Sequence, residues 1–255
     1  MFRPRIIPAL LLRNLGLVKS VGFKNYKYVG DPINAVKIFN DLRADELVFL
    51  DILASREKRV ISLDFVLKVG DEANMPFSVG GGIRTIQDIK SVLRAGAEKV
   101  VINTYAIEDP AFIRKAAEEF GSSTITVCID VKKKILGKQQ VYIYSGTKST
   151  NVDPVSFAKN MEEMGAGELI INSIDKDGSM EGYDIGLIKA VSESVTIPVV
   201  ALGGAGKLSD LNEAVKNGHA SAVAAGSLFV FHGPRRAVLI NYPQPDEKTI
   251  KPIAC

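Results

Sequence analysis

Short apolar runs alternate with amphipathic stretches from one end of the chain to the other. Eight of these runs have the length of strands: residues 5–12, 46–52, 76–79, 99–103, 124–130, 168–173, 198–202 and 221–226. Continuous apolar runs are typical of parallel strands that are buried on both faces. About eight strand–helix units in 255 residues match the size of an α/β TIM (β/α)8 barrel. We predict that fold, with a doubly wound open sheet as the alternative.

The chain also repeats itself with a spacing of about 122 residues. Asp31 and Asp153 each precede a proline at the start of an amphipathic stretch. An aspartate at the N-cap followed by proline is typical of a helix start, and Asp109 begins a third such stretch. Long excursions follow the first strand of each half, at residues 13–30 and 131–151, and the second alternates as a hairpin does. Self-similarity of this kind indicates duplication.

The repeat breaks down after Ser227. Gly-Pro and Tyr-Pro pairs flank the segment in which an amphipathic eighth helix is expected. That helix is therefore predicted to be short, missing or replaced by an extended tail. We predict a single TIM-barrel domain over residues 1–255, with half-barrels at about 1–122 and 123–231 and an atypical tail at 232–255.

Composition limits the classes of protein that the chain can represent. Hydrophobic residues make up 46%, which is ample for a large core. The net charge of +3 does not favour binding to nucleic acid or to a membrane surface. With two cysteines, no signal-peptide pattern and no run of transmembrane length, we expect a soluble cytoplasmic protein.

Two glycine-rich stretches, at residues 78–83 and 200–206, each follow a predicted strand and precede a predicted helix. Glycines at a strand end let backbone N–H groups approach an anion closely. One such turn is equally well explained as a tight strand-to-helix connection without a ligand. Two of them in one chain favour a ligand with two anionic ends.

Acidic residues at strand ends are the candidates for chemistry, because TIM-barrel active sites lie at the carboxyl ends of the strands. Asp130 ends an apolar strand and precedes the long hairpin, so we favour a role for it as an acid or base. For Asp51 we favour a structural role as an N-cap or loop ion pair. Asp177 follows the sixth strand, and Leu11 occupies the position of the first strand that corresponds to Asp130.

Four charged residues stand at the starts of predicted strands: Arg5, Glu46, Lys99 and Glu168. Two are basic and two are acidic. If they point inward they form a salt-bridged ring that closes the base of the barrel, since buried charges need partners. Four solvated charges are the alternative.

The combination of these motifs resembles the cyclase subunit of imidazole glycerol phosphate synthase, an HisF-like family of histidine biosynthesis. The resemblance extends to about residue 231 and includes Asp130. Its other motifs are residues 5–7, 30–32, 45–52, 79–83, 102–104, 144–146, 165–168, 173–178, 182–184 and 203–207.

The resemblance implies a heterodimer with a glutaminase (HisH-like) subunit and a bisphosphorylated small-molecule substrate, without a cofactor or a metal. Ammonia from that partner would enter at the barrel base and cross the core. At the mouth it would attack a nucleotide-like intermediate, giving imidazole glycerol phosphate and an aminoimidazole ribonucleotide. No nucleic acid or membrane partner is implied.

The resemblance also assigns roles to particular residues. Lys19 lies in the loop that covers the substrate, and Asp130 is catalytic. The ammonia gate falls on Arg5, Glu46, Lys99 and Glu168. The phosphate-binding positions are Gly82, Asn103 and Thr104 in one half, and Asp177, Gly178, Gly204, Gly226 and Ser227 in the other.

Leu11 departs from the family, which has a second catalytic aspartate at this position. Loss of one partner of an acid–base pair costs roughly two to four decades of rate. The chain thus resembles divergent paralogues found with surface-polysaccharide genes, in which the barrel passes ammonia to an enzyme that amidates a sugar.

Three hypotheses remain open from the sequence. The first is a working cyclase in which Asp51 or Asp177 replaces the missing acid. The second is a subunit that conducts ammonia for amidation of a lipopolysaccharide or other surface sugar. The third is a related sugar-phosphate isomerase, which the predicted gate disfavours because an isomerase does not use ammonia.

Overall fold

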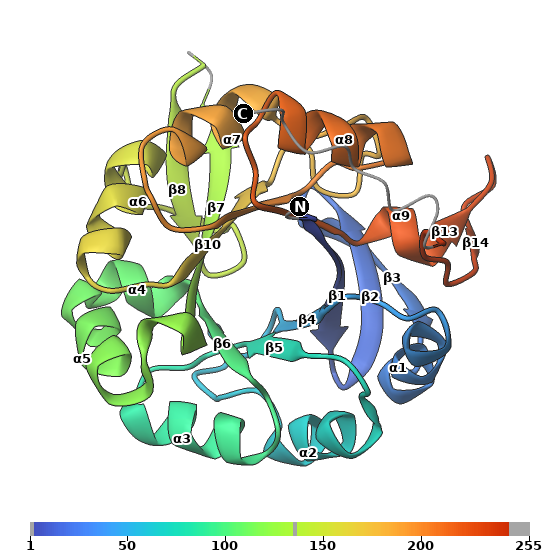
Figure 1. Ribbon diagram of the computed structural model, residues 1–255, viewed down its shortest axis with the longest axis horizontal. Coiled ribbons are helices and arrows are strands. Elements are labelled where there is room, and N and C mark those ends of the chain that lie inside the picture. The colour runs from blue at the N-terminus through green and yellow to red at the C-terminus, as the bar shows by residue number, and fades with distance from the viewer. Residues whose placement is uncertain (1–2, 135–136, 245–255) are drawn as a thin grey trace.

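Eight parallel strands close into a barrel in the computed structural model, which describes residues 3–134 and 137–244 (Figure 1). They are β1 (Arg5–Arg13), β4 (Leu47–Asp51), β5 (Phe77–Gly80), β6 (Lys99–Ile102), β7 (Ile125–Lys133), β10 (Glu168–Ser173), β11 (Val199–Leu202) and β12 (Ala222–Ala225). The pairing of β7 with β10 and of β12 with β1 leaves this ring of strands without a free edge. The predicted TIM barrel is confirmed, and the open sheet is wrong.

Helices surround the barrel. The longer ones are α1 (Pro32–Asp41), α2 (Leu63–Glu72), α3 (Ile86–Arg94), α5 (Pro110–Phe120), α6 (Pro154–Glu163), α7 (Ile185–Ser192) and α8 (Leu208–Lys216). The short ones are α4 (Thr104–Glu108), the 3-10 turn η1 (Ser122–Thr124) and α9 (Ser227–Val230). Asp31 and Asp153 cap α1 and α6, each accepting a backbone N–H at 2.9 Å, as predicted. The predicted helix start at Asp109 is confirmed, since Asp109 is the N-cap of α5, but its side chain makes no capping hydrogen bond.

Apolar residues fill the inside of the barrel. We call them the interior cluster: Ile7, Ala9, Val48, Val101, Cys128, Ile170, Val200, Leu202, Ala222 and Ala224. A larger apolar cluster lies between the strands and the surrounding helices. Because successive side chains of a strand face opposite sides, the barrel strands other than β5 contribute alternately to the two clusters.

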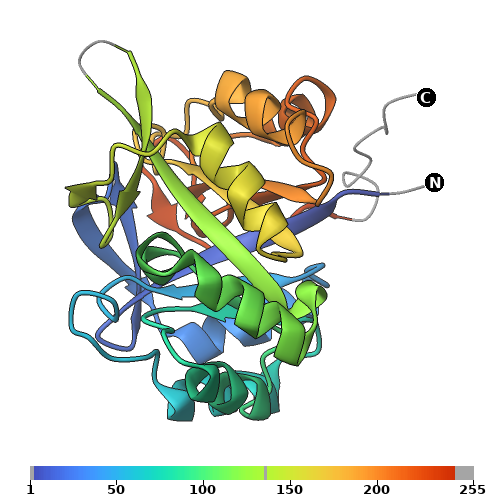
Figure 2. The same cartoon turned by 90° about the vertical axis from the view of Figure 1, so that its left-hand side faces the viewer.

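Hairpins extend the barrel beyond the carboxyl ends of its strands (Figure 2). β2 (Gly16–Val21) and β3 (Lys24–Gly30) continue β1 as antiparallel strands. β8 (Gln139–Ile143) and β9 (Lys148–Ser149) continue β7, which confirms the hairpin predicted there. Both extensions border the mouth of the barrel. Across the described residues, no helix is long and apolar enough to cross a membrane.

The chain after α9 replaces the expected eighth helix. A small antiparallel hairpin, β13 (Phe231–His232) with β14 (Ala237–Val238), is followed by an extended segment that the structure describes as far as residue 244. The rest of the predicted tail, residues 245–255, lies outside the described residues.

Tyr242 anchors this extended segment to the barrel. Its side chain is only 5% exposed, and its ring packs on Phe39 and Phe229 with centroid separations of 6.4 and 5.4 Å. The hydroxyl donates to the carbonyl of Ile6 at 2.8 Å and accepts the N–H of Asp45 at 3.0 Å. The tail thereby packs against α1, where a helix would otherwise bury apolar surface.

We predict that Tyr242→Phe lowers the free energy of unfolding by about 1–3 kcal/mol, because two backbone groups lose their partner at a buried position. Tyr242→Ala removes the ring as well and is expected to cost about 3–5 kcal/mol. Urea denaturation measures both. Tyr28→Phe is the control, since Tyr28 is 66% exposed; equal losses for the two Phe variants would contradict this role of the tail.

Candidate active site at the barrel mouth

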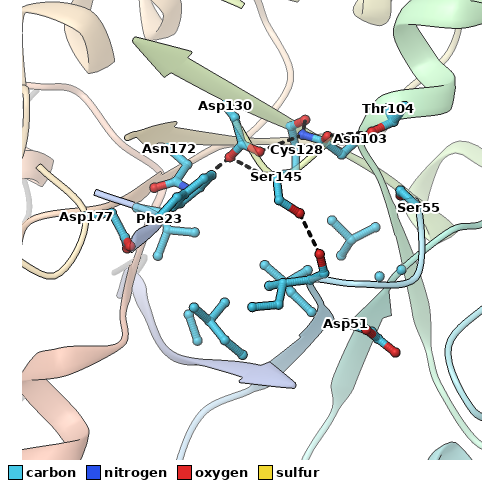
Figure 3. A pocket seen from close by; sticks show the side chains of 18 of the residues that line it. Phe23, Asp51, Ser55, Asn103, Thr104, Cys128, Asp130, Ser145, Asn172 and Asp177 are labelled. Atoms are coloured by element: carbon cyan, nitrogen blue, oxygen red, sulfur yellow. Dashed lines mark hydrogen bonds between the residues drawn. The ribbon is translucent and has the colours of Figure 1, made fainter. Parts of the chain in front are cut away.

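A cavity opens at the carboxyl ends of the strands (Figure 3). Predicted site residues that line it are Lys19, Gly82, Asn103, Thr104, Asp130, Asp177, Gly226 and Ser227. Gly178 and Gly204 are not among the lining residues. Leu11 and Asp51 also face the cavity. The structure thus places most of the site residues predicted in the two halves of the chain around one cavity.

Asp130 is the most buried carboxylate of this cavity, with 7% of the residue exposed. Asn103 donates to one carboxylate oxygen at 3.1 Å, and Asn172 donates to the other at 2.9 Å. Burial raises the pKa of Asp130 to about 7, although the two amide donors oppose the shift. Near neutral pH the group is therefore divided between its two protonation states, which suits an acid or base.

Two neighbours of Asp130 were not identified from the sequence. Asn172 lies beside Asp130 in the register of β10 with β7, and its own amide oxygen has no hydrogen-bond partner among the described residues. The Cys128 thiol contacts the Asp130 carboxylate at 3.9 Å. A spacing could have revealed Asn172, because Lys99, Val101 and Asn103 recur as Glu168, Ile170 and Asn172.

Asp51 serves the loop that follows β4. Its carboxylate pairs with Arg59 at 2.5 Å and accepts the N–H of Leu53 at 3.0 Å. It lies across the cavity from Asp130 (Figure 3). These contacts agree with the structural role that the sequence favoured for Asp51, and they leave its carboxylate engaged.

Asp177 is the remaining carboxylate that could act together with Asp130. The Ser20 hydroxyl donates to it at 3.1 Å. Burial raises the pKa of Asp177 to about 6, while the nearby Lys19 ammonium opposes the shift. Leu11 of β1 lines the same cavity with an apolar side chain, which cannot transfer a proton.

Lys19 lies on β2 and is 5% exposed, so it belongs to a packed hairpin strand where a loop was expected. Its ammonium donates to the carbonyl of Ala9. Burial lowers the pKa of Lys19 to about 8, against the attraction of Asp177. A Cβ at Gly226 would stand 2.4 Å from the Lys19 nitrogen, so the glycine permits this approach. A cation is thereby held beside a predicted anion position.

The two halves present similar backbone geometry at the mouth. Asn103 and Gly226 precede short helices with φ, ψ of −122°, −86° and −102°, −70°. Gly82 and Gly178 have φ of +67° and +71°, and in each case a Cβ would stand 1.8 Å from a backbone carbonyl oxygen. No larger residue fits these two turns. The residues before the two short helices differ in their side chains: the Asn103 amide donates to Asp130, whereas Gly226 has no side chain.

The opposite end of the barrel is closed by the four strand-start charges. Arg5 contacts both Glu46 and Glu168, and Lys99 lies 3.4 and 3.1 Å from the same two carboxylates. The salt-bridged ring that the sequence suggested is therefore present, and the alternative of separately solvated charges is wrong. Each cation is shared between two anions. Among the described residues, no group of three or more His, Cys, Asp or Glu could hold a metal ion.

The fold and this site define a TIM barrel with paired glycine turns and a buried acid at its mouth. Residues 5–234 match the family described as Histidine biosynthesis protein. The chain belongs to that family and is an HisF-like relative of the cyclase subunits of imidazole glycerol phosphate synthase.

Three relatives illustrate the similarity. An Alkaliphilus metalliredigens protein named imidazole glycerol phosphate synthase subunit HisF is 42% identical over 232 residues, covering 91% of this chain and 92% of the relative. A Leptospira interrogans protein provisionally given the same name is 45% identical over 249 residues, covering 97% and 98%. A Pseudomonas aeruginosa protein provisionally named subunit hisF2 is 46% identical over 243 residues, covering 95% and 97%.

We predict that Asn172→Ala raises the pKa of Asp130 further above its value of about 7, because a hydrogen bond that stabilises the carboxylate is lost. A carboxyl ¹³C titration of the protein measures this shift. Asn212→Ala is the control, since Asn212 lies on α8 and, among the residues that the structure describes, its side chain donates only to the carbonyl of Leu208. An unchanged or lower midpoint in Asn172→Ala would show that this amide does not set the proton affinity of the site.

Proposed function

We propose that this chain is the ammonia-using subunit of a glutamine amidotransferase complex, of the imidazole glycerol phosphate synthase type. A glutaminase partner docks at the barrel base and releases ammonia from glutamine. The ammonia crosses the barrel interior and acts on a bisphosphorylated substrate at the mouth. The supporting observation is that the ring of charges and Asp130 lie at opposite ends of one apolar interior.

Two strands connect these ends in the same order. β6 and the residue that follows it carry Lys99, Val101 and Asn103 at successive inward positions, and β10 carries Glu168, Ile170 and Asn172. In each set of three, the first residue belongs to the salt-bridged ring, the second is apolar, and the third is an asparagine that donates a hydrogen bond to Asp130. A path along these strands therefore begins at the ring and ends at the acid.

The interior cluster selects the species that can cross. It offers aliphatic side chains and one thiol, and a bare ammonium ion would lose its hydration there without gaining a counter-ion. Neutral ammonia loses much less, so the interior favours the nucleophilic form. Asp130, with a pKa near 7, can then exchange a proton with the reacting groups at the mouth.

The mouth holds the substrate through two sets of residues. The first arm consists of Gly82, Asn103 and Thr104, and the second arm consists of Asp177, Gly178, Gly204, Gly226 and Ser227. Backbone N–H groups at these turns offer donors to phosphate oxygens. The buried Lys19 ammonium adds a positive charge to the second arm.

A second candidate function follows from Leu11. The family's acid–base pair is reduced to Asp130, and Asp51 is engaged by Arg59. In this alternative the chain no longer closes an imidazole ring. It conducts ammonia from the glutaminase to a separate enzyme, which amidates a lipopolysaccharide or another surface sugar.

One assay separates the two functions. The bisphosphorylated intermediate is incubated with the protein and ammonium salts, without a glutaminase. The cyclase function predicts turnover that falls by about two to four decades in Asp130→Asn. Absence of turnover, together with stimulation of a glutaminase subunit on mixing, would leave only the conducting function. Leu11→Asp, with Leu11→Asn as its matched control, then tests whether the missing acid alone restores ring closure.

The gate has a separate prediction. Lys99→Ala leaves Arg5 to balance two carboxylates, which opens one side of the ring. We expect more glutamine to be hydrolysed per ammonia used, measured as released ammonia in the complex with a glutaminase. Lys90→Ala, an exposed substitution on α3, is the control. Equal coupling in both variants would remove the gate from the proposal.

A further inference from the structure

The β13–β14 hairpin brings an arginine to the mouth of the barrel from a segment that replaces a helix. In Figure 1 it lies at the right, beside α9 and close to β3. Lys27 of β3 stands 5.7 Å from the centre of the Phe231 ring, which confirms that the two hairpins are neighbours. The turn between β13 and β14 carries Arg235 and Arg236.

Arg236 reaches back to the second arm. Its two terminal nitrogens donate to the carbonyls of Gly178 at 3.3 Å and Ser179 at 3.1 Å. The residue itself has φ of +48°, a left-handed backbone that non-glycine residues adopt rarely. The Arg236 side chain is partly buried by these contacts, while the adjacent Arg235 is exposed.

The turn at residues 177–179, to which Arg236 donates, is held by hydrogen bonds from two sides. On one side, Gly22 donates its N–H to the carbonyl of Asp177 at 2.9 Å. On the other side, Arg236 binds the next two carbonyls. Three successive peptide oxygens of the Asp177–Gly178–Ser179 turn thus have partners, and the orientation of its peptide planes is set by β2 and by the tail hairpin together.

One donor of this turn remains unused. Gly178 is buried, yet within residues 3–134 and 137–244 its N–H donates to no acceptor. Backbone N–H groups of buried residues are nearly always paired, so this N–H in a fixed turn is a donor available to a ligand with an acceptor oxygen. A phosphate oxygen suits both this donor and the nearby Lys19 ammonium.

We propose that Arg236 is a positioning residue for phosphate binding by the second arm. It holds the Gly178 turn in the conformation that presents its N–H, and its charge adds to the attraction for an anion. This inference rests on the proposed function, because it assumes that the second arm binds a phosphate of the substrate. It assigns a purpose to the tail hairpin, which occupies the place of an ordinary barrel helix.

The test follows inorganic phosphate binding through backbone amide resonances of the full chain. Gly178 and Ser227 report on the second arm, while Gly82 and Thr104 report on the first arm. We expect Arg236→Ala to raise the phosphate Kd at the second arm about tenfold, the effect of losing hydrogen bonds to a charged group, and to leave the first arm unchanged. The first arm is thus an internal control for folding.

Three further variants sharpen the test. Arg235→Ala removes an equal charge one residue away and is expected to bind as the wild type does. Arg236→Lys keeps the charge but cannot donate to two carbonyls in a fixed fork, so partial recovery is expected. Arg236→Gln keeps donors without the charge and separates the two contributions.

The outcomes of these experiments test the role of Arg236 separately from the proposed function on which it rests. If the wild type binds phosphate and Arg236→Ala binds it equally at the second arm, the positioning role is wrong and the proposed function stands. Equal weakening in Arg235→Ala and Arg236→Ala would also overturn it, since only long-range charge would be involved. If the wild type binds no phosphate at either arm, the proposed cradle is wrong and the inference falls with it.

Discussion

The alternation of side chains along the strands of a closed barrel decides which residues of this chain meet. β6 and β10 flank β7 on its two sides, so their third inward residues, Asn103 and Asn172, both point at Asp130. Their first inward residues are charged and meet at the other end. A shift of one residue in either strand would turn both the amide and the charge out of the barrel.

Much of this arrangement could be predicted from the sequence, because it depends on local patterns. The apolar runs place each barrel strand within a few residues of its observed bounds, and the opposite charges at strand starts indicate the ring. The charge–apolar–asparagine spacing shared with Lys99, Val101 and Asn103 marks Asn172 as an inward residue, but its contact with Asp130 depends on the pairing of β7 with β10, which that spacing does not specify. Arg236 and Tyr242 were missed because both act on residues far away in the chain. The division into half-barrels stays a prediction.

At the mouth of the barrel the glycine turns occur in both halves, whereas the proton-transfer groups do not. Glycine turns with left-handed backbones occur in both halves and leave no room for larger residues. The proton-transfer groups are not distributed symmetrically, since Asp130 faces an apolar Leu11. In the proposed function, substrate binding and ring closure therefore rest on different residues of the mouth.

The contact of Tyr242 with Ile6 joins residues that are 236 positions apart. During synthesis β1 leaves the ribosome first, and the group that caps its carbonyl leaves near the end. β12, which pairs with the same strand, is also made late. β2 and β4 pair with β1 early, but the barrel cannot close until β12 is made, so one edge of its first strand stays unpaired for most of translation.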